Sequence, residues 1–324
     1  MQLFKTPDFN FIRWRWQALV LSTVVIVAGA VMIATRGLSL GIDFSGGTAV
    51  VVRFDQAVTE DQVRRAVDSI PGDKGVQRFG EIADREWLIR LPQTRAPEQG
   101  AALEQGSQQI VDLLRKAGLP SFQVISTDIV GPVIGADLQR RGIYATLASI
   151  IAVTLYIAFR FRFSFAVGAI AATLHDIFVT FAFLTFFGYE LSLNVVAAIL
   201  TITGYSVNDT IVIFDRVREN LRSMRRDSLE QVVNTSVNQT LARTVITAGT
   251  TFLAVLSLYL FGGEVLRGFA FTMLVGIISG TYSTVFIASA IAIILSQRRR
   301  AAMTAAPGRP EARPGRKARG AQAS

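Results

Sequence analysis

Three ionisable side chains, Asp176, Asp209 and Arg243, lie inside long apolar stretches of this 324-residue sequence. A charged side chain at the centre of a membrane span costs about 2.5–3.5 kcal/mol on insertion scales, so such residues usually face a partner or a water-filled cavity. An aspartate beside an arginine on a neighbouring span can take up and release a proton. The same two residues can also form a static ion pair that locks the helices together, and the residue types alone leave both interpretations open.

Polar residues accompany Asp209 and Arg243 at helical spacing. Tyr205 and Asn208 share a helix face with Asp209, and Thr247 shares a face with Arg243. Asp209 precedes the end of its apolar stretch and Arg243 follows the start of the next, so we expect the two at similar depth. The candidate proton relay is therefore Asp209 and Arg243, and the candidate supporting residues are Asn208, Thr210, Tyr205, Thr247, His175 and Asp176.

Two further features of the apolar stretches concern helix packing. His175 and Asp176 are consecutive, which turns their side chains about 100° apart on a helix, so they do not automatically form a dyad. Packing or interhelical hydrogen bonding is favoured over proton relay for this pair. Gly276 and Gly280 have the Gly-x-x-x-Gly spacing of a close-packing helix face, although such spacings also arise by chance.

The composition is that of a membrane protein, with 51% hydrophobic and 18% charged residues. There is no cysteine and only one histidine, which excludes disulfides, thiolate sites and multi-histidine metal sites, and we expect no metal or other cofactor. The net charge of +9 does not indicate nucleic acid, because eight of the 33 Lys+Arg follow Leu295 and five lie from Arg216 to Arg226, beside apolar stretches. Such clusters are typical of cytoplasmic flanks near anionic lipid.

Six apolar runs are long enough to span a membrane, which takes about 20 residues. The first follows Arg13 and Arg15 and is interpreted as an uncleaved helix rather than a signal peptide. The bias of basic residues in the short loops places both termini in the cytoplasm of a cell with an inner membrane. The expected segments are a cytoplasmic N-terminus at 1–16, spans at 17–35, 142–160, 165–187, 191–214, 241–261 and 268–296, a cytoplasmic loop at 215–240, and a disordered basic tail at 297–324.

The segment 36–141 is expected to form a small extracytoplasmic α+β domain between the first two spans. Strands are expected at 48–54, 76–79, 86–91 and 122–130, with one helix starting at a capping box of Thr59 and Gln62 and a second at 97–117. The order βαββαβ predicts a ferredoxin-like fold. The domain has no catalytic motif, so a surface that binds an unfolded chain and a plain structural cap are equally supported.

A second capping-box spacing, at Ser228 and Gln231, lies in the loop between the fourth and fifth spans. It predicts a short amphipathic helix at the cytoplasmic interface.

Three sequence motifs resemble those of the SecF proteins, members of the SecD/SecF family in the resistance-nodulation-division superfamily. They are GIDFSGGT at 41–48, LHD at 174–176 and GYSVNDTIVIFDRVREN at 204–220. The last string is long enough to be specific, whereas a Gly-Gly pair before a strand is weak evidence alone. The resemblance covers 36–295 in layout.

The resemblance implies a non-enzymatic subunit of the Sec protein translocase. Its implied partners are SecD, which has the same six-helix layout, the SecYEG channel, exported chains and the lipid bilayer, with YajC and YidC as further candidates and no nucleic acid. The complex would use the proton motive force to complete translocation after the SecA-driven step. The positions that match the family's proton site are Asp209 and Arg243.

Two other classes of protein would share charged residues in the membrane. A small-molecule or lipid exporter of the same superfamily usually has two six-helix repeats and two large loops, whereas this chain has one of each. A non-transporting scaffold is the third interpretation. A single six-helix repeat implies a separate partner that supplies the second half.

Overall fold

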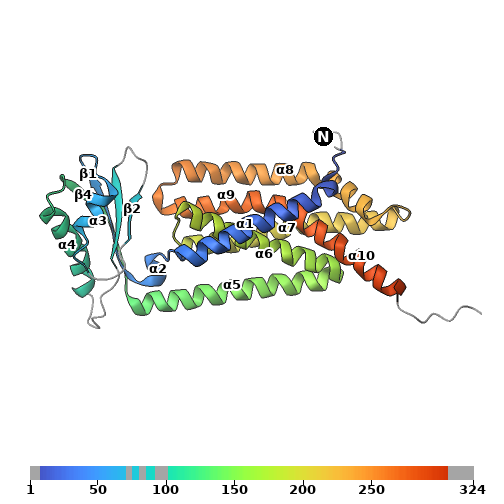
Figure 1. The fold of residues 1–324 in the computed structure, drawn as a ribbon, viewed down its shortest axis with the longest axis horizontal. Helices are drawn as coiled ribbons and strands as arrows, with labels where there is room; N and C mark the ends of the chain where they lie inside the picture. Colours follow the sequence, from blue (N-terminus) through green and yellow to red (C-terminus); the bar gives the residue numbers. More distant parts are fainter. Residues whose placement is uncertain (1–7, 71–74, 80–84, 92–100, 306–324) are drawn as a thin grey trace, which may run out of the picture.

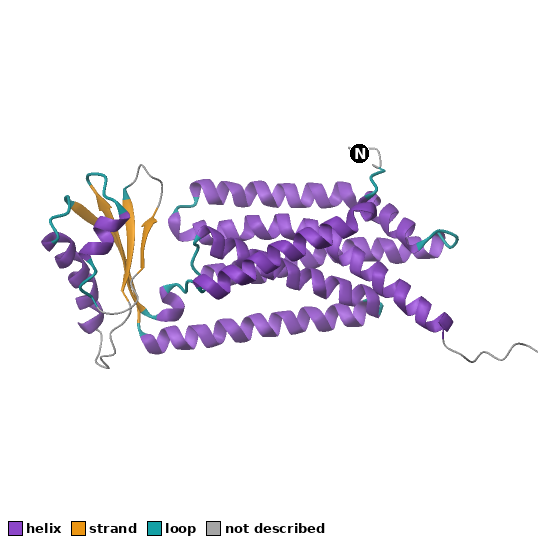
Figure 2. Cartoon of the chain, viewed as in Figure 1, coloured by secondary structure: helices purple, strands orange, loops and turns teal. Residues whose placement is uncertain are grey.

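A small sheet domain lies at one end of a bundle of long helices (Figure 1). This computed structural model describes residues 8–70, 75–79, 85–91 and 101–305. Within these residues, strands are confined to the end domain and helices make up the bundle (Figure 2). Six helices of the bundle are long and apolar enough to cross a membrane, as expected from the sequence.

The end domain is a four-stranded antiparallel sheet with the order β2-β3-β1-β4. The strands are β1 (Gly47–Phe54), β2 (Gly75–Phe79), β3 (Glu86–Leu91) and β4 (Phe122–Val130), and the helices are α3 (Glu60–Ala66) and α4 (Ala101–Lys116). The βαββαβ order of a ferredoxin-like fold is therefore confirmed. The expected start of the second helix, 97–100, lies outside the described residues.

One face of β1 contributes to the core of this domain. Val50, Val52 and Phe54 are buried on one face of the sheet, where they meet Val63 of α3 and Ile110 of α4. Both helices therefore cover the same face. The edge strand β4 is mostly exposed.

The expected spans correspond to longer helices of the bundle, except that the fourth was expected from 191 and its helix begins only at Leu193. The 3₁₀ turn η1 (Phe11–Trp14) leads into α1 (Arg15–Arg36), and the remaining spans are α5 (Pro132–Arg160), α6 (Phe163–Phe187), α7 (Leu193–Ser223), α8 (Leu229–Phe261) and the run formed by α9 (Glu264–Ser283), η3 (Thr284–Ala288) and α10 (Ser289–Ala305). The spans α6 and α9 are the most buried, whereas α1, α5 and α8 are largely exposed.

The start of α5 differs from the expected boundary at 142. The helix begins at Pro132, directly after β4 and Gly131, because proline is well suited to the first helical turn. Its polar first turns are held by an ion pair between Asp137 and Arg141. Gly131 is therefore the single residue between β4 of the sheet domain and α5.

The expectation of a separate amphipathic helix after Ser228 is wrong. Ser228 does form the capping box with Gln231, but the helix that starts there continues without a break to Phe261 as α8. The segment 229–248 contains no glycine or proline that would end it. The first turns of α8 pack against the end of α7, where Asn220 donates to Ser236.

The last span also differs from expectation. It begins at Glu264 and contains one π-helical segment, η3, where Gly168 of α6 approaches so closely that an added Cβ would lie 2.5 Å from the carbonyl oxygen of Ala288. The expected disordered tail at 297–324 is wrong for its first part, because α10 is helical to Ala305. Residues 306–324 lie outside the described part of the chain.

Glycines bring α7 and α9 into close contact. A Cβ added at Gly276 would lie 2.2 Å from Cδ1 of Ile202, and one added at Gly280 would lie 3.0 Å from Cβ of Ser206. The predicted close-packing face is thus confirmed, and it faces the helix that carries Asp209.

The sheet domain is fastened to the bundle by polar contacts at its base. Glu190, between α6 and α7, accepts from Arg90 at 2.7 Å and from Gln77 at 2.8 Å. Burial raises the pKa of Glu190 although Arg90 lowers it. Asp43, in the short helix α2 (Ile42–Ser45) that was not expected, accepts from the backbone N–H of Leu193 at 2.8 Å and so caps the first turn of α7.

Candidate functional site

Asp209 lies midway along α7 with its carboxylate turned toward α8. Its Oδ1 accepts a hydrogen bond from Thr244 Oγ1 at 2.7 Å. Its Oδ2 is buried and has no hydrogen-bond partner among the described residues. Leaving a buried acceptor without a hydrogen bond costs free energy, and the cost is larger for a charged group. Binding of a proton, a water molecule or another group at Oδ2 would remove this cost.

A small cavity of about 40 Å³ adjoins Asp209. Arg243, Thr244, Tyr205 and Gly280 are among its lining residues. A volume of this size can hold a water molecule, which needs about 10–15 Å³ of such space. The site can therefore bring water to the carboxylate within the membrane span.

Arg243 lines the same cavity as Asp209 but does not form an ion pair with it in the described chain. Its side chain is exposed on the surface of the bundle. The residue bonded directly to Asp209 is Thr244, which the sequence reasoning missed. The signal that could have identified it is its position next to Arg243 on the helix that faces α7.

The other candidate supporting residues are dispersed around the site. Tyr205 lines the cavity and is half-buried, whereas Asn208 and Thr247 are exposed. Thr247 donates to its own helix at the carbonyl of Arg243. Thr210 is buried and bonds Thr284 of η3 at 3.0 Å, so it joins α7 to the π-helical segment rather than to Asp209.

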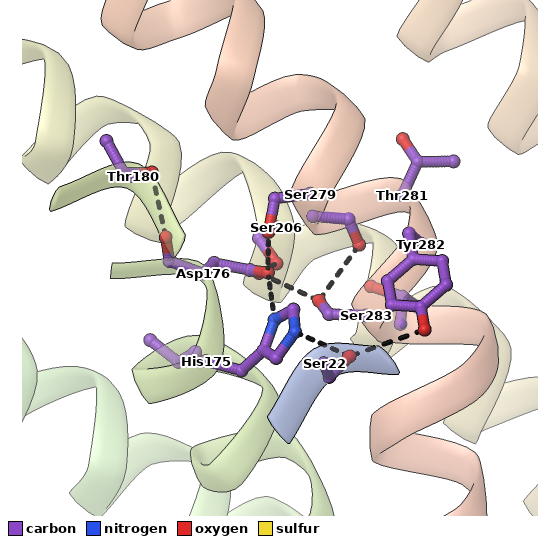
Figure 3. Close-up of polar contacts among 12 residues, drawn as sticks. Ser22, His175, Asp176, Thr180, Ser206, Ser279, Thr281, Tyr282 and Ser283 are labelled. Carbon is purple, nitrogen blue, oxygen red and sulfur yellow. Dashed lines mark hydrogen bonds and ion pairs between the residues drawn. The ribbon is translucent and has the colours of Figure 1, made fainter. Parts of the chain in front are cut away.

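A second carboxylate, Asp176 of α6, lies in a fully buried polar cluster (Figure 3). Its Oδ2 accepts from Ser206 at 2.6 Å and from Ser283 at 2.8 Å. Its Oδ1 accepts from Ser279 at 2.7 Å and contacts His175 Nδ1 at 3.1 Å. Three serine hydroxyls from α7 and α9 therefore satisfy the charge that burial would otherwise make costly.

His175 extends the cluster from Asp176 to α1. Its Nε2 lies 3.0 Å from Ser22 Oγ, and Ser22 lies 3.3 Å from the hydroxyl of Tyr282. The contact between His175 and Asp176 was not predicted from the sequence, because consecutive helix residues diverge, yet their side chains bend toward each other (Figure 3). The cluster joins four helices, α1, α6, α7 and α9.

Gly280 lies between the two carboxylate sites. A Cβ added there would lie 3.1 Å from Ser206 Oγ and 3.6 Å from Asp176 Oδ2, and Gly280 also lines the Asp209 cavity. Ser206 precedes Asp209 by one helical turn on α7. The two sites are therefore neighbours, one satisfied by four polar contacts and the other left with an unpaired oxygen.

Two protein-family models match the chain. The model of the C-terminal region of the protein export membrane proteins SecD/SecF matches residues 109–298, and the model of the SecD/SecF GG motif matches residues 31–58.

Curated relatives cover nearly the whole sequence. The protein translocase subunit SecF of Desulfurispirillum indicum is 40% identical, with 87% of this chain and 90% of the relative covered. SecF of Escherichia coli O157:H7 is 36% identical, with 90% and 89% covered.

Solved structures share the fold. SecDF of Thermus thermophilus, described as a translocon-associated membrane protein, matches 91% of this chain with a TM-score of 0.81 and 34% identity. A SecDF in a super-membrane-facing form matches 94% with a TM-score of 0.68. This chain spans only 40% and 41% of those two chains. The family models, the curated relatives and the solved structures agree that the chain belongs to the SecF branch of the SecD/SecF family of protein-export membrane proteins.

Proposed function

We propose that this chain is the half of a two-part export complex that couples protein translocation to the proton motive force through Asp209. The observation that carries the proposal is the buried Oδ2 of Asp209, which has no hydrogen-bond partner in the described chain and adjoins a cavity large enough for water. When Oδ2 carries a proton, it can donate a hydrogen bond to a partner across the cavity. Release of the proton leaves a charge that the exposed Arg243 at the cavity edge can approach.

The energy available from this exchange is sufficient to drive a change of shape. One proton that moves through a potential of 100 mV releases about 2.3 kcal/mol. Since about 1.4 kcal/mol corresponds to a tenfold change in an equilibrium, one proton shifts a two-state equilibrium by roughly 40-fold. The polar attachment of the sheet domain at Glu190 and Asp43 gives a route by which movement of α7 reaches that domain.

SecD is the proposed partner that supplies the second six-helix half. The exposed faces of α5 and α8 support this, because each is a long span with little protein packed against it in the described chain. The larger length of the solved SecDF chains, of which this chain matches 40% and 41%, supports it as well. The complex would act at SecYEG after the SecA-driven step, with YajC and YidC as further candidate partners.

The proposed location is the inner membrane, with both termini in the cytoplasm. The described N-terminal and C-terminal helices, α1 at Arg15 and α10, reach the end of the bundle that is opposite the sheet domain (Figure 1). The described basic residues from Arg216 to Arg226, together with Arg298 and Arg299 of α10, lie at this end, as the positive-inside rule requires of a cytoplasmic face. The sheet domain then lies outside the cytoplasm, where it meets exported chains.

The proposal is tested by replacing Asp209 with Asn in the full complex. Export of a secretory protein into membrane vesicles is measured with and without a proton gradient, and then with a sodium gradient instead. Asp209→Asn is expected to remove the gradient-dependent part of export while the chain still copurifies with SecD, because Asn keeps the size and the bond to Thr244. The control is Asp137→Asn, which removes an exposed carboxylate on α5. Unchanged gradient dependence in Asp209→Asn overturns the proposal.

A further inference from the structure

The hydrogen bonds around His175 determine which of its nitrogens carry protons. The hydroxyl of Tyr282 donates to the backbone carbonyl of Ala18 at 2.8 Å, so its oxygen is free to accept. Ser22 Oγ donates to that oxygen at 3.3 Å and thereby uses its only proton. The contact of 3.0 Å between Ser22 Oγ and His175 Nε2 then needs a proton on Nε2.

The other face of the imidazole needs a second proton. His175 Nδ1 and Asp176 Oδ1 lie 3.1 Å apart, and two lone pairs would repel each other at that distance. The proton is either on Nδ1, which makes an imidazolium beside a carboxylate, or on Oδ1, which makes a neutral imidazole beside a carboxylic acid. Both forms hold the same number of protons and have no net charge.

The pair therefore holds one proton more than a neutral imidazole beside a carboxylate would hold. We propose that His175 and Asp176 form a second proton-binding site, separate from Asp209, whose proton keeps α1 bonded to α9 through Ser22 and Tyr282. The ligand of this site is a proton that comes from water. The proton forms an N–H bond with Nδ1 of His175 or an O–H bond with Oδ1 of Asp176, and it returns to water when that bond breaks. Proton binding by His175 and Asp176 does not require the proposed role of Asp209.

Loss of the proton rearranges the contact between the helices. The remaining imidazole proton stays on Nδ1, where the carboxylate accepts it, so Nε2 becomes an acceptor. Ser22 then turns its proton from Tyr282 to Nε2. The hydroxyl of Tyr282 cannot donate to Ala18 and to Ser22 at the same time, so one bond between α1 and α9 is lost.

The surroundings isolate this exchange from other titratable groups. The face of α9 contributes the hydroxyls of Tyr282, Ser279 and Ser283 to the pair, α7 contributes Ser206, and α1 contributes Ser22. Tyr282 is the only titratable side chain among these contacts. Along α7 the nearest titratable residues are Tyr205, directly before Ser206, and Asp209, one turn beyond it, and both line the cavity that Gly280 also lines.

The sequence provides a direct test, because His175 is its only histidine. The full-length chain, labelled with ¹⁵N-histidine in lipid bilayers, gives one pair of imidazole nitrogen signals in solid-state NMR. At acidic pH, Nε2 is expected to be protonated. At alkaline pH, the signals are expected to change to those of a neutral ring protonated on Nδ1 alone. Imidazole signals that stay the same from acidic to alkaline pH overturn the proposal.

A matched pair of serine variants tests the link to α1. Ser22→Ala removes the acceptor of the Nε2 proton, so the fraction of rings protonated at Nε2 is expected to fall at a pH where that fraction is intermediate in the parent. Ser257→Ala is the control, since Ser257 lies on α8 and its one side-chain hydrogen bond within the described residues is to the carbonyl of Leu253 in its own helix. An unchanged fraction in Ser22→Ala, or an equal fall in both variants, contradicts the role of Ser22.

Discussion

Substitution of Gly276 by alanine tests the close packing of α9 against α7, the helix that carries Asp209. The added Cβ would lie 2.2, 2.5 and 2.6 Å from three side-chain atoms of Ile202, and contacts below 3.0 Å are essentially absent from real proteins. Ile202 is buried and β-branched, so it cannot turn away at low cost. Forcing a methyl group into such a core costs about 1–3 kcal/mol.

A second substitution shows whether the cost comes from this contact. Ile202→Ala removes all three clashing atoms, and alone it is expected to cost about 2–5 kcal/mol because it leaves a cavity. In the double variant the new methyl group occupies part of that cavity. The double variant is therefore expected to be more stable than the sum of the single changes predicts, by about 1–3 kcal/mol.

The assay is unfolding of the full-length parent, the two single variants and the double variant in detergent micelles, which gives the free energy of unfolding of each. Gly249→Ala on α8 is the control, because no atom lies within 4 Å of its added Cβ. It is expected to be neutral or to stabilise by up to about 1 kcal/mol through helix propensity. If Gly276→Ala behaves like this control, or if the two changes are additive, the close contact between α7 and α9 is refuted.

Three further predictions concern other parts of the chain. Thr244→Val removes the hydrogen bond to Asp209, which is worth about 1.5–3 kcal/mol for a charged acceptor, so gradient-driven export is expected to fall by about 10- to 150-fold; a rate equal to the parent's would contradict this. Burial raises the pKa of Glu190 despite Arg90. The contact between Glu190 and the sheet domain is therefore most stable when the pH lies below the ordinary pKa of a free glutamate. This contribution to its stability is lost as the pH rises through the raised pKa of Glu190. The protection of amides at the base of the sheet domain, measured as the ratio of the intrinsic exchange rate to the observed rate, should be highest at acidic pH, and Glu190→Gln should remove this pH dependence of the protection. Ser228→Ala should lower the free energy of unfolding by about 1 kcal/mol through loss of the cap on α8, and an unchanged value would show that the cap adds no stability.

The order of elements in the sheet domain could be predicted because it depends on local signals. The apolar run Ala49–Val52 in β1 and the capping box at Thr59 act over a few residues, and both are present in the structure. The capping box at Ser228 was equally correct as a helix start, but it could not show where that helix ends. The length of α8 depends on its packing against the end of α7, which no short stretch of sequence displays.

From the sequence, the candidate site could be predicted only as a set of charged residues whose burial in a membrane span costs free energy. The price of burying a charge identifies Asp176, Asp209 and Arg243 from the sequence. It does not identify the hydroxyl groups that satisfy them, because serine and threonine are common in membrane helices and bond their own backbone as readily. Ser279 and Ser283 are one turn apart and follow the small-residue face of α9, a signal that could have placed them beside an acid.

The carboxylates of Asp176 and Asp209 differ in how many hydrogen bonds hold them. Asp176 is held by Ser206, Ser279 and Ser283, so its position is fixed whether or not His175 shares a proton with it. Asp209 has one partner and an unpaired oxygen, so a proton changes its bonding more than that of Asp176. Because Ser206 and Asp209 lie one turn apart on the same helix, any movement of α7 that accompanied the proposed protonation of Asp209 would also act on the bond from Ser206 to Asp176.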